Sequence, residues 1–147
     1  MSFNEKLLGD LKEAMKAKDA TRLSCLRMLK AALKNREVEK MAPLDENEFQ
    51  TVVSSLVRKC RESIEEFTKA GRPDLAEKES AELEILHQYL PEQLTQEQIE
   101  EKTREVITEL GAAGIKDLGK VMKAAMALMA GRAQGSDVNA AAKKLLS

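Results

Sequence analysis

One histidine and two cysteines are the side chains of this sequence best suited to nucleophilic or general-base catalysis near neutral pH. His87 is the single histidine, and Cys25 and Cys60 stand far apart in the sequence. A nucleophile needs a base beside it, so a Ser–His or Cys–His pair would have to use His87. We predict instead a structural or surface histidine near a helix end and two reduced cysteines on helical faces, suited to a reducing compartment. No catalytic residue is therefore assigned.

Metal ligation is the next chemistry to consider. Four carboxylates alternate with apolar residues within one predicted helix, at Glu77, Glu79, Glu82 and Glu84. They lack the Glu-x-x-His pattern of di-iron bundles, and the cysteines form neither a CxxC motif nor a set with histidines. We interpret this helix face as solvated and acidic. The sequence predicts no metal site and no cofactor.

Basic residues are distributed unevenly, although the formal net charge of the chain is only −1. Residues 1–44 contain ten bases and six acids, residues 45–91 contain six bases and eleven acids, and residues 92–147 contain eight of each. Arg27, Lys30 and Lys34 fall within a narrow arc of one predicted helix. Lysine and arginine in such an arc can neutralise phosphates without distinguishing bases.

A second basic area is expected near the C-terminal end of the chain. Lys120 and Lys123 should lie opposite the apolar face of their helix, where Ala124 and Ala127 would leave a nearly flat surface. Three more cations could extend this area: Arg132, Lys143 and Lys144. The alternative is that these lysines only keep the helices soluble. Both interpretations stay open at this point, and nucleic-acid binding is the leading functional hypothesis for these residues.

The segment GRAQGS between the last two predicted helices is a possible anion contact. It joins helix to helix and lacks the Gly-Lys-Ser/Thr ending of a phosphate loop. Arg132 and backbone amides could still meet a phosphate at the N-terminus of the last helix, where the helix dipole favours an anion. We favour the simpler interpretation, a tight turn between two helices. Aromatic residues are few, so base stacking with single-stranded RNA is not expected.

These residues are positioned by a chain that should be all-α, because charged and aliphatic residues dominate while glycine, proline and aromatics are scarce. Capping and breaking residues predict seven helices, among them two with capping boxes, at Asp45–Glu48 and Thr95–Gln98, one capped by Asp117 and one by Ser136 or Asp137. The helices cover about 4–18, with Ser2 or Asn4 as cap, and then about 20–41, 46–70, 74–90, 96–110, 118–130 and 137–146. Leu110 should be buried on its helix, and Val121, Ala125 and Met129 should share a buried face. We place an N-terminal helical bundle at 1–91 and a small three-helix domain at 92–147.

No apolar stretch is long enough to cross a bilayer, and the longest is in AAMALMA. No secretory signal pattern precedes the first helix. We expect a cytoplasmic protein that does not bind membranes.

Three segments carry a resemblance to a known family. They are RLSCLRMLKAALKNREVEK, the stretch from RKCRESIEEFTKAGRPDLAEKE to YLPEQLT, and GKVM followed by GRAQGSDVN. Over nearly its full length the chain resembles a stand-alone member of the GatB/YqeY family. The matching motif positions are Gly119, Lys120 and Met122 in GKVM, and Gly131, Arg132 and Gly135 in the hinge. The family usually has Asp where this chain has Gln134.

The resemblance implies a role beside tRNA enzymes, because related domains form the tail of the B subunit of glutamine-dependent tRNA amidotransferase and extend some glutaminyl-tRNA synthetases. It implies a non-catalytic tRNA-binding or accessory protein. A second possibility is a module that docks on an amidotransferase or an aminoacyl-tRNA synthetase through an apolar patch around Met126 and Leu146. A third, carbon–nitrogen ligase activity with glutamine as amido donor, rests on kinship alone, since fold similarity does not confer chemistry.

Overall fold

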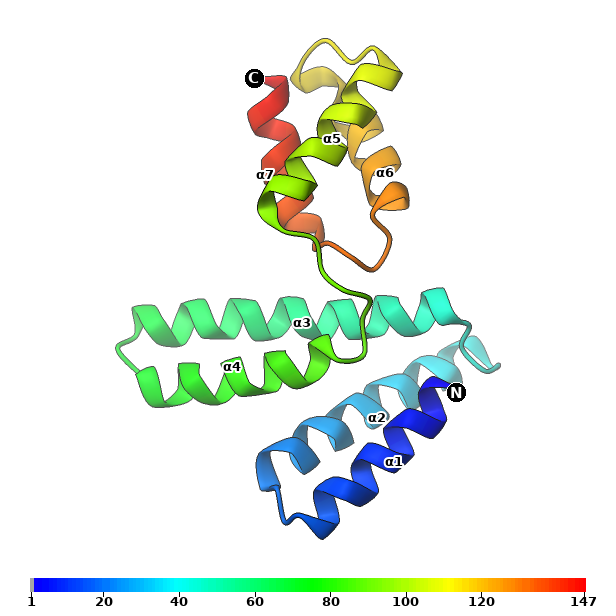
Figure 1. The fold of residues 1–147 in the computed structure, drawn as a ribbon, viewed down its shortest axis with the longest axis vertical. Helices are drawn as coiled ribbons and strands as arrows, with labels where there is room; N and C mark the ends of the chain where they lie inside the picture. Colours follow the sequence, from blue (N-terminus) through cyan, green and yellow to red (C-terminus); the bar gives the residue numbers. More distant parts are fainter. Residues whose placement is uncertain (1) are drawn as a thin grey trace. The chain divides into compact units, whose positions relative to one another are not determined.

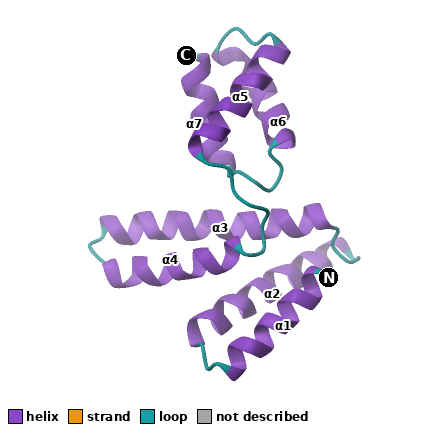
Figure 2. Ribbon diagram, in the orientation of Figure 1, coloured by secondary structure: helices purple, strands orange, loops and turns teal. Residues whose placement is uncertain are grey.

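Helices account for all the regular secondary structure of residues 2–147, the part of the chain that the computed structural model describes (Figures 1 and 2). No strand occurs in this range, and the all-α prediction is confirmed. The helices span Phe3–Lys16 (α1), Ala20–Lys40 (α2), Glu46–Lys69 (α3), Pro73–His87 (α4), Gln96–Leu110 (α5), Leu118–Leu128 (α6) and Gly135–Leu146 (α7), with a 3-10 turn, η1, at Ile115–Asp117.

Two predicted capping boxes define the starts of α3 and α5. Asp45 accepts the N–H of Glu48 at 2.8 Å, and the Glu48 carboxylate accepts the N–H of Asp45 at 3.2 Å. Thr95 and Gln98 exchange the same pair of hydrogen bonds at α5. Both boxes satisfy N–H groups that a helix start leaves unpaired. These predicted starts are confirmed.

One helix end and one helix cap differ in detail from the prediction. α4 ends at His87 rather than Leu90, and the N–H groups of the next three residues bond to carbonyls three positions back. Pro91 disfavours helical geometry in the residue before it, which explains the tighter turn. Asp117 occupies the N-cap position of α6, as predicted, but its side chain makes no capping hydrogen bond to that helix, because the carboxylate accepts the N–H of Ala113 at 3.0 Å.

The start of α7 also differs from the sequence prediction. Ser136 or Asp137 was expected as the cap, but the helix begins at Gly135 with Gln134 in the extended N-cap conformation. The Gln134 side chain makes no capping hydrogen bond. Asp137 instead lies in the first turn, where a carboxylate interacts favourably with the helix dipole.

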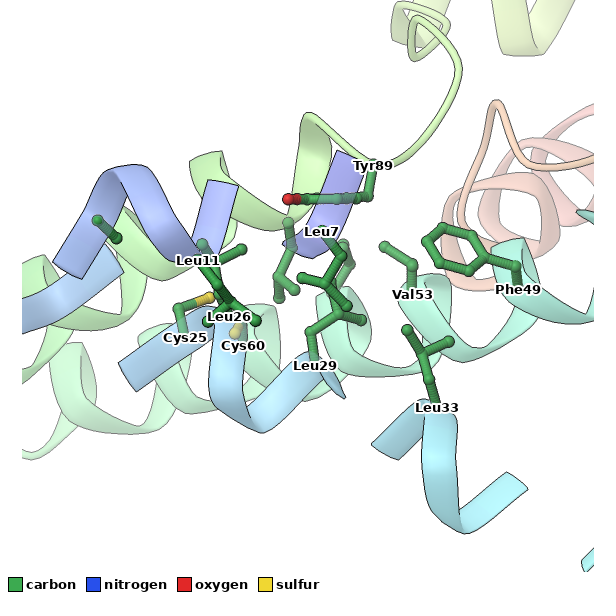
Figure 3. Packing of buried hydrophobic residues seen from close by; sticks show 13 residues of the cluster. Leu7, Leu11, Cys25, Leu26, Leu29, Leu33, Phe49, Val53, Cys60 and Tyr89 are labelled. Carbon is green, nitrogen blue, oxygen red and sulfur yellow. The ribbon is translucent and has the colours of Figure 1, made fainter. Parts of the chain in front are cut away.

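The chain forms two compact units, one up to Leu90 and one from Pro91 onward. In the first unit, α3 and α4 form a hairpin that turns at Gly71, whose φ of 70° suits glycine. α1 packs on α2, and α2 packs on both α3 and α4. The core contains Leu26 and Leu29 of α2 with Val53 of α3, all fully buried (Figure 3).

Tyr89 closes this core with a polar contact. It is 2 % exposed, and its hydroxyl donates to the Asp10 carboxylate, which also pairs with Arg22 at 3.4 Å. Burial, and then the hydrogen bond to Asp10, raise the pKa of the Tyr89 phenol, so it stays protonated at neutral pH.

Tyr89→Phe is expected to lower the free energy of unfolding by about 1.5–3 kcal/mol, because it removes a hydrogen bond to a charged group and leaves the ring in place. Urea denaturation followed by circular dichroism measures this. Asp10→Asn in the same background provides a double-mutant cycle. A Tyr89→Phe transition that superimposes on the wild type would show that the hydroxyl contributes nothing.

The second unit has its own core, built from α5, α6 and α7. The buried face of α6 holds Val121, Ala125 and Met129, as the sequence predicted. Leu110 was predicted to be buried on α5, but it is 49 % exposed because it ends the helix. Leu146 is only 8 % exposed. Leu146 therefore packs in the core instead of flanking it, and Met126 is half-buried against the same core, so little of the apolar patch expected around these two residues is exposed.

Candidate nucleic-acid interface

The outer face of α2 is the clearest basic surface in residues 2–147. Arg27, Lys30 and Lys34 are all exposed. At about 100° per residue they lie within an arc of roughly 60°. The inner face of the same helix carries four buried side chains, Cys25, Leu26, Leu29 and Leu33. Burial of that apolar stripe fixes the three cations toward solvent, as the sequence predicted.

The cations on the outer face of α2 have no acidic residues beside them, whereas Arg22 is paired. The segment 21–36 contains no acidic residue. Arg22 turns inward and is neutralised by Asp10 at 3.4 Å and Glu13 at 3.7 Å. Within residues 2–147, no hydrogen bond or ion pair engages Arg27 or its two neighbours on the face. The α2 face, defined as Arg27, Lys30 and Lys34, thus presents three uncompensated positive charges.

A groove of about 390 Å³ lies between α2 and α3, and the sequence analysis did not anticipate it. Its lining includes Arg36, which pairs with Glu39 at 3.2 Å, and Lys59, which is exposed. At about 100° per residue, Arg36 points roughly opposite to Arg27 around the helix. The groove is therefore a separate feature and does not extend the α2 face.

The C-terminal unit carries a smaller basic surface on α6. Lys120 and Lys123 are exposed and form no ion pair or hydrogen bond within the described range. They lie away from the buried residues Val121 and Ala125, as predicted. Of the two alanines expected beside them, Ala127 is exposed, but Ala124 packs partly against the core. The open area on α6 is thus narrower than the sequence indicated.

The three cations expected to extend this surface behave differently from one another. Lys143 is exposed and unpaired among the described residues. Lys144 is neutralised by Glu100 of α5, with 3.1 Å between Nζ and Oε1. The exposed Arg132 side chain donates from Nε to the backbone carbonyl of Glu92 at 3.2 Å. The combined surface therefore has fewer free charges than its five residues suggested.

The loop between α6 and α7 is held by its backbone. The Leu94 N–H donates to the Arg132 carbonyl at 2.8 Å, and the Gln93 side chain donates to the Gly131 carbonyl at 2.8 Å. Gly131 has a φ of 73°, a conformation that favours glycine. These contacts support the turn interpretation of this segment, whereas no contact tests the phosphate interpretation.

The remaining glycines of the motif differ in their surroundings. A Cβ placed on Gly119 would meet nothing within 4 Å, whereas one on Gly135 would lie 4.0 Å from the Met126 side chain. Met122 packs partly into the core. Gly131 is thus the motif glycine with a clear backbone requirement.

The cysteines are unsuited to nucleophilic catalysis. Both are buried, and the Cys25 thiol donates to the Glu82 carbonyl at 3.7 Å. Burial first, and then nearby glutamates, raise the pKa of each thiol to about 12. The reactive thiolate is therefore disfavoured at neutral pH.

His87 is half-buried near the end of α4, as predicted for a structural histidine. Burial and the charge of Arg61 lower its pKa, and Glu84 opposes this shift. His87 is thus mainly neutral at physiological pH.

No helix among the described residues is both long and apolar enough to cross a membrane. The architecture defines an all-helical protein, and residues 2–147 present exposed basic helix faces.

Comparison with protein families supports the resemblance noted above. The model described as "Yqey-like protein" matches residues 4–146, and the chain belongs to the YqeY-like family. Its relatives include the protein named "Altered inheritance of mitochondria protein 41, mitochondrial" in three fungi. The Eremothecium gossypii protein is 43% identical over 85 residues, covering 57% of this chain and 46% of the relative.

Two further relatives share that name. The Lachancea thermotolerans protein is 38% identical over 107 residues, covering 71% of this chain and 57% of its own length. The Kluyveromyces lactis protein is 37% identical over 108 residues, covering 71% of this chain and 58% of its own length. The chain thus spans about half the length of these relatives. Their names place those proteins in mitochondria, while the cytoplasmic location of this chain stays a prediction.

Proposed function

We propose that this chain is a non-catalytic accessory protein that binds tRNA by contacting its phosphates through exposed basic helix faces. The observation that carries the proposal is the α2 face, where Arg27, Lys30 and Lys34 are exposed and unpaired within residues 2–147. Cations of this kind release counterions from a nucleic acid when they contact phosphates. Lys120 and Lys123 of α6 supply a second set of such contacts.

The proposed mode of recognition is by backbone and shape. Tyr89 and Phe49 are buried, and Phe3 stacks on Phe49 with 4.0 Å between ring centroids. These rings belong to the core and offer no exposed platform for a base. A folded RNA with closely spaced phosphates therefore suits the surface better than an unpaired strand does. Because the chain resembles domains that assist tRNA enzymes, we propose tRNA as the RNA that it binds.

Electrostatic binding of this kind predicts a strong dependence on salt. With four or five phosphate contacts, the logarithm of the binding constant should fall with the logarithm of salt concentration at a slope of about −3 to −4. Fluorescence anisotropy with a labelled tRNA across a salt series measures the slope. A binding constant that is independent of salt would contradict the proposal. Capture of a synthetase or amidotransferase that survives nuclease treatment would favour protein docking instead.

A further inference from the structure

A thiol and two carboxylates converge inside the first unit. The potential ligand atoms of Cys60 on α3 and of Glu79 and Glu82 on α4 all lie within 4.8 Å of one another. Cys60 is only 4 % exposed, and both carboxylates are half-buried. This differs from the sequence interpretation, which treated the glutamates of α4 as one solvated face. Glu77 and Glu84 do fit that interpretation, since both are exposed.

The helix hairpin explains why these groups meet. Glu79 and Glu82 are three residues apart, so they share one side of α4. α3 packs along that side, and α2 approaches from the same core. The fully buried Cys25 of α2 lies nearby, with its Sγ 3.7 Å from the Glu82 backbone carbonyl, but it is not among the three groups whose ligand atoms converge. Figure 3 shows both sulfur atoms within the buried cluster.

The setting of this cluster favours a positive guest. Two carboxylates lie together in half-buried positions beside a buried thiol. A cation would offset the desolvation of their negative charge.

We propose that Cys60, Glu79 and Glu82 bind a divalent transition metal of the zinc class, which leaves the fourth tetrahedral position to water. Thiolate and carboxylate together suit zinc, whereas magnesium and calcium take oxygen ligands only. Tetrahedral bond lengths of about 2.0–2.3 Å correspond to ligand separations of about 3.3–3.8 Å. The ligand atoms would thus have to approach one another by up to about 1.5 Å. On coordination the Cys60 thiol loses its proton to solvent, and its sulfur forms the metal–sulfur bond.

Cobalt(II) provides a direct test, because it takes similar sites and reports a bound thiolate by its charge-transfer absorption. The full chain, reduced and freed of metal with a chelator, is titrated with cobalt and then with zinc. We expect a saturable thiolate–cobalt band that zinc abolishes, and a higher melting temperature with zinc. Loss of a hydrogen-bond partner of a metal ligand costs about 10–100-fold in metal affinity, so loss of a ligand itself should cost at least about tenfold.

Three variants make the test specific. Cys60→Ser should remove the thiolate band, and E79Q/E82Q should lower the cobalt affinity at least about tenfold. Glu77→Gln, an exposed change on the same helix, should bind as the wild type does. Circular dichroism without metal checks that each variant folds. If Cys60→Ser does not fold, the cobalt affinity of E79Q/E82Q tests the proposal instead. Absence of the band in the wild type, or its persistence in folded Cys60→Ser, would overturn the proposal.

Discussion

Replacement of Arg27, Lys30 and Lys34 together by glutamate is expected to lower the affinity for tRNA by about 100-fold or more at 0.1 M salt. Each phosphate contact contributes about 0.7–0.9 to the slope of log K against log salt, so three contacts contribute about 2.1–2.7. If these contacts contribute nothing to affinity at 1 M salt, a slope of about 2.1–2.7 over a tenfold change in salt makes their contribution at 0.1 M at least about 100-fold. The slope itself should become shallower by about 2. Fluorescence anisotropy across a salt series measures both quantities.

The acidic hairpin of α3 and α4 offers a matched control. Lys69, Arg72 and Lys78 are exposed, and their replacement by glutamate changes the net charge by the same amount. Lys69 and Arg72 are already paired with Glu65 and Asp74, so they are poor candidates for phosphate contacts. This control variant should keep most of the affinity and most of the slope. Equal losses in both variants would mean that total charge, not the α2 face, determines binding.

Much of the α2 face could be predicted from sequence, because it follows from one periodicity. The apolar residues of α2 recur at helical spacing, and burying them turns Arg27, Lys30 and Lys34 outward. The absence of acids between Thr21 and Arg36 was visible in the sequence and is the signal that distinguishes this face from ordinary soluble lysines. Whether a cation can pair with an acidic residue of its own helix can be predicted without knowledge of how the helices pack.

The errors arose where a side chain meets another helix. Lys144 faces Glu100 across the contact between α7 and α5, a pair 44 residues apart that no local pattern indicates. Cys60 and Glu79 meet because the α3–α4 hairpin sets one register among several that the turn at Gly71 would allow. Similarly, spacing alone placed Leu146 beside the packed face of α7, whereas it is buried. Tertiary packing decides such contacts, and a single sequence does not specify its register.

The α2 face also depends on the core behind it, and this dependence gives the second large effect. Leu29 lies between Arg27 and Lys30 in sequence but is fully buried on the opposite side of α2. Leu29→Ala is expected to lower the free energy of unfolding by about 2–5 kcal/mol, because it removes buried methyl groups and leaves a cavity. Urea denaturation measures the loss. The adjacent Met28→Ala is the control, since Met28 is 39% exposed and its replacement should cost less than about 1 kcal/mol.

The same pair of variants separates folding from phosphate contact. Leu29→Ala leaves every cation of the α2 face in place, so at a temperature where it is folded its tRNA affinity and salt slope should match those of the wild type. As the temperature approaches its midpoint, affinity should fall in proportion to the folded fraction, because only the folded helix fixes the three cations on one side. If the unfolded chain bound tRNA equally well, the charges alone would suffice and the helical presentation would be irrelevant. If Leu29→Ala were as stable as Met28→Ala, burial of Leu29 in this core would not contribute to the stability of α2.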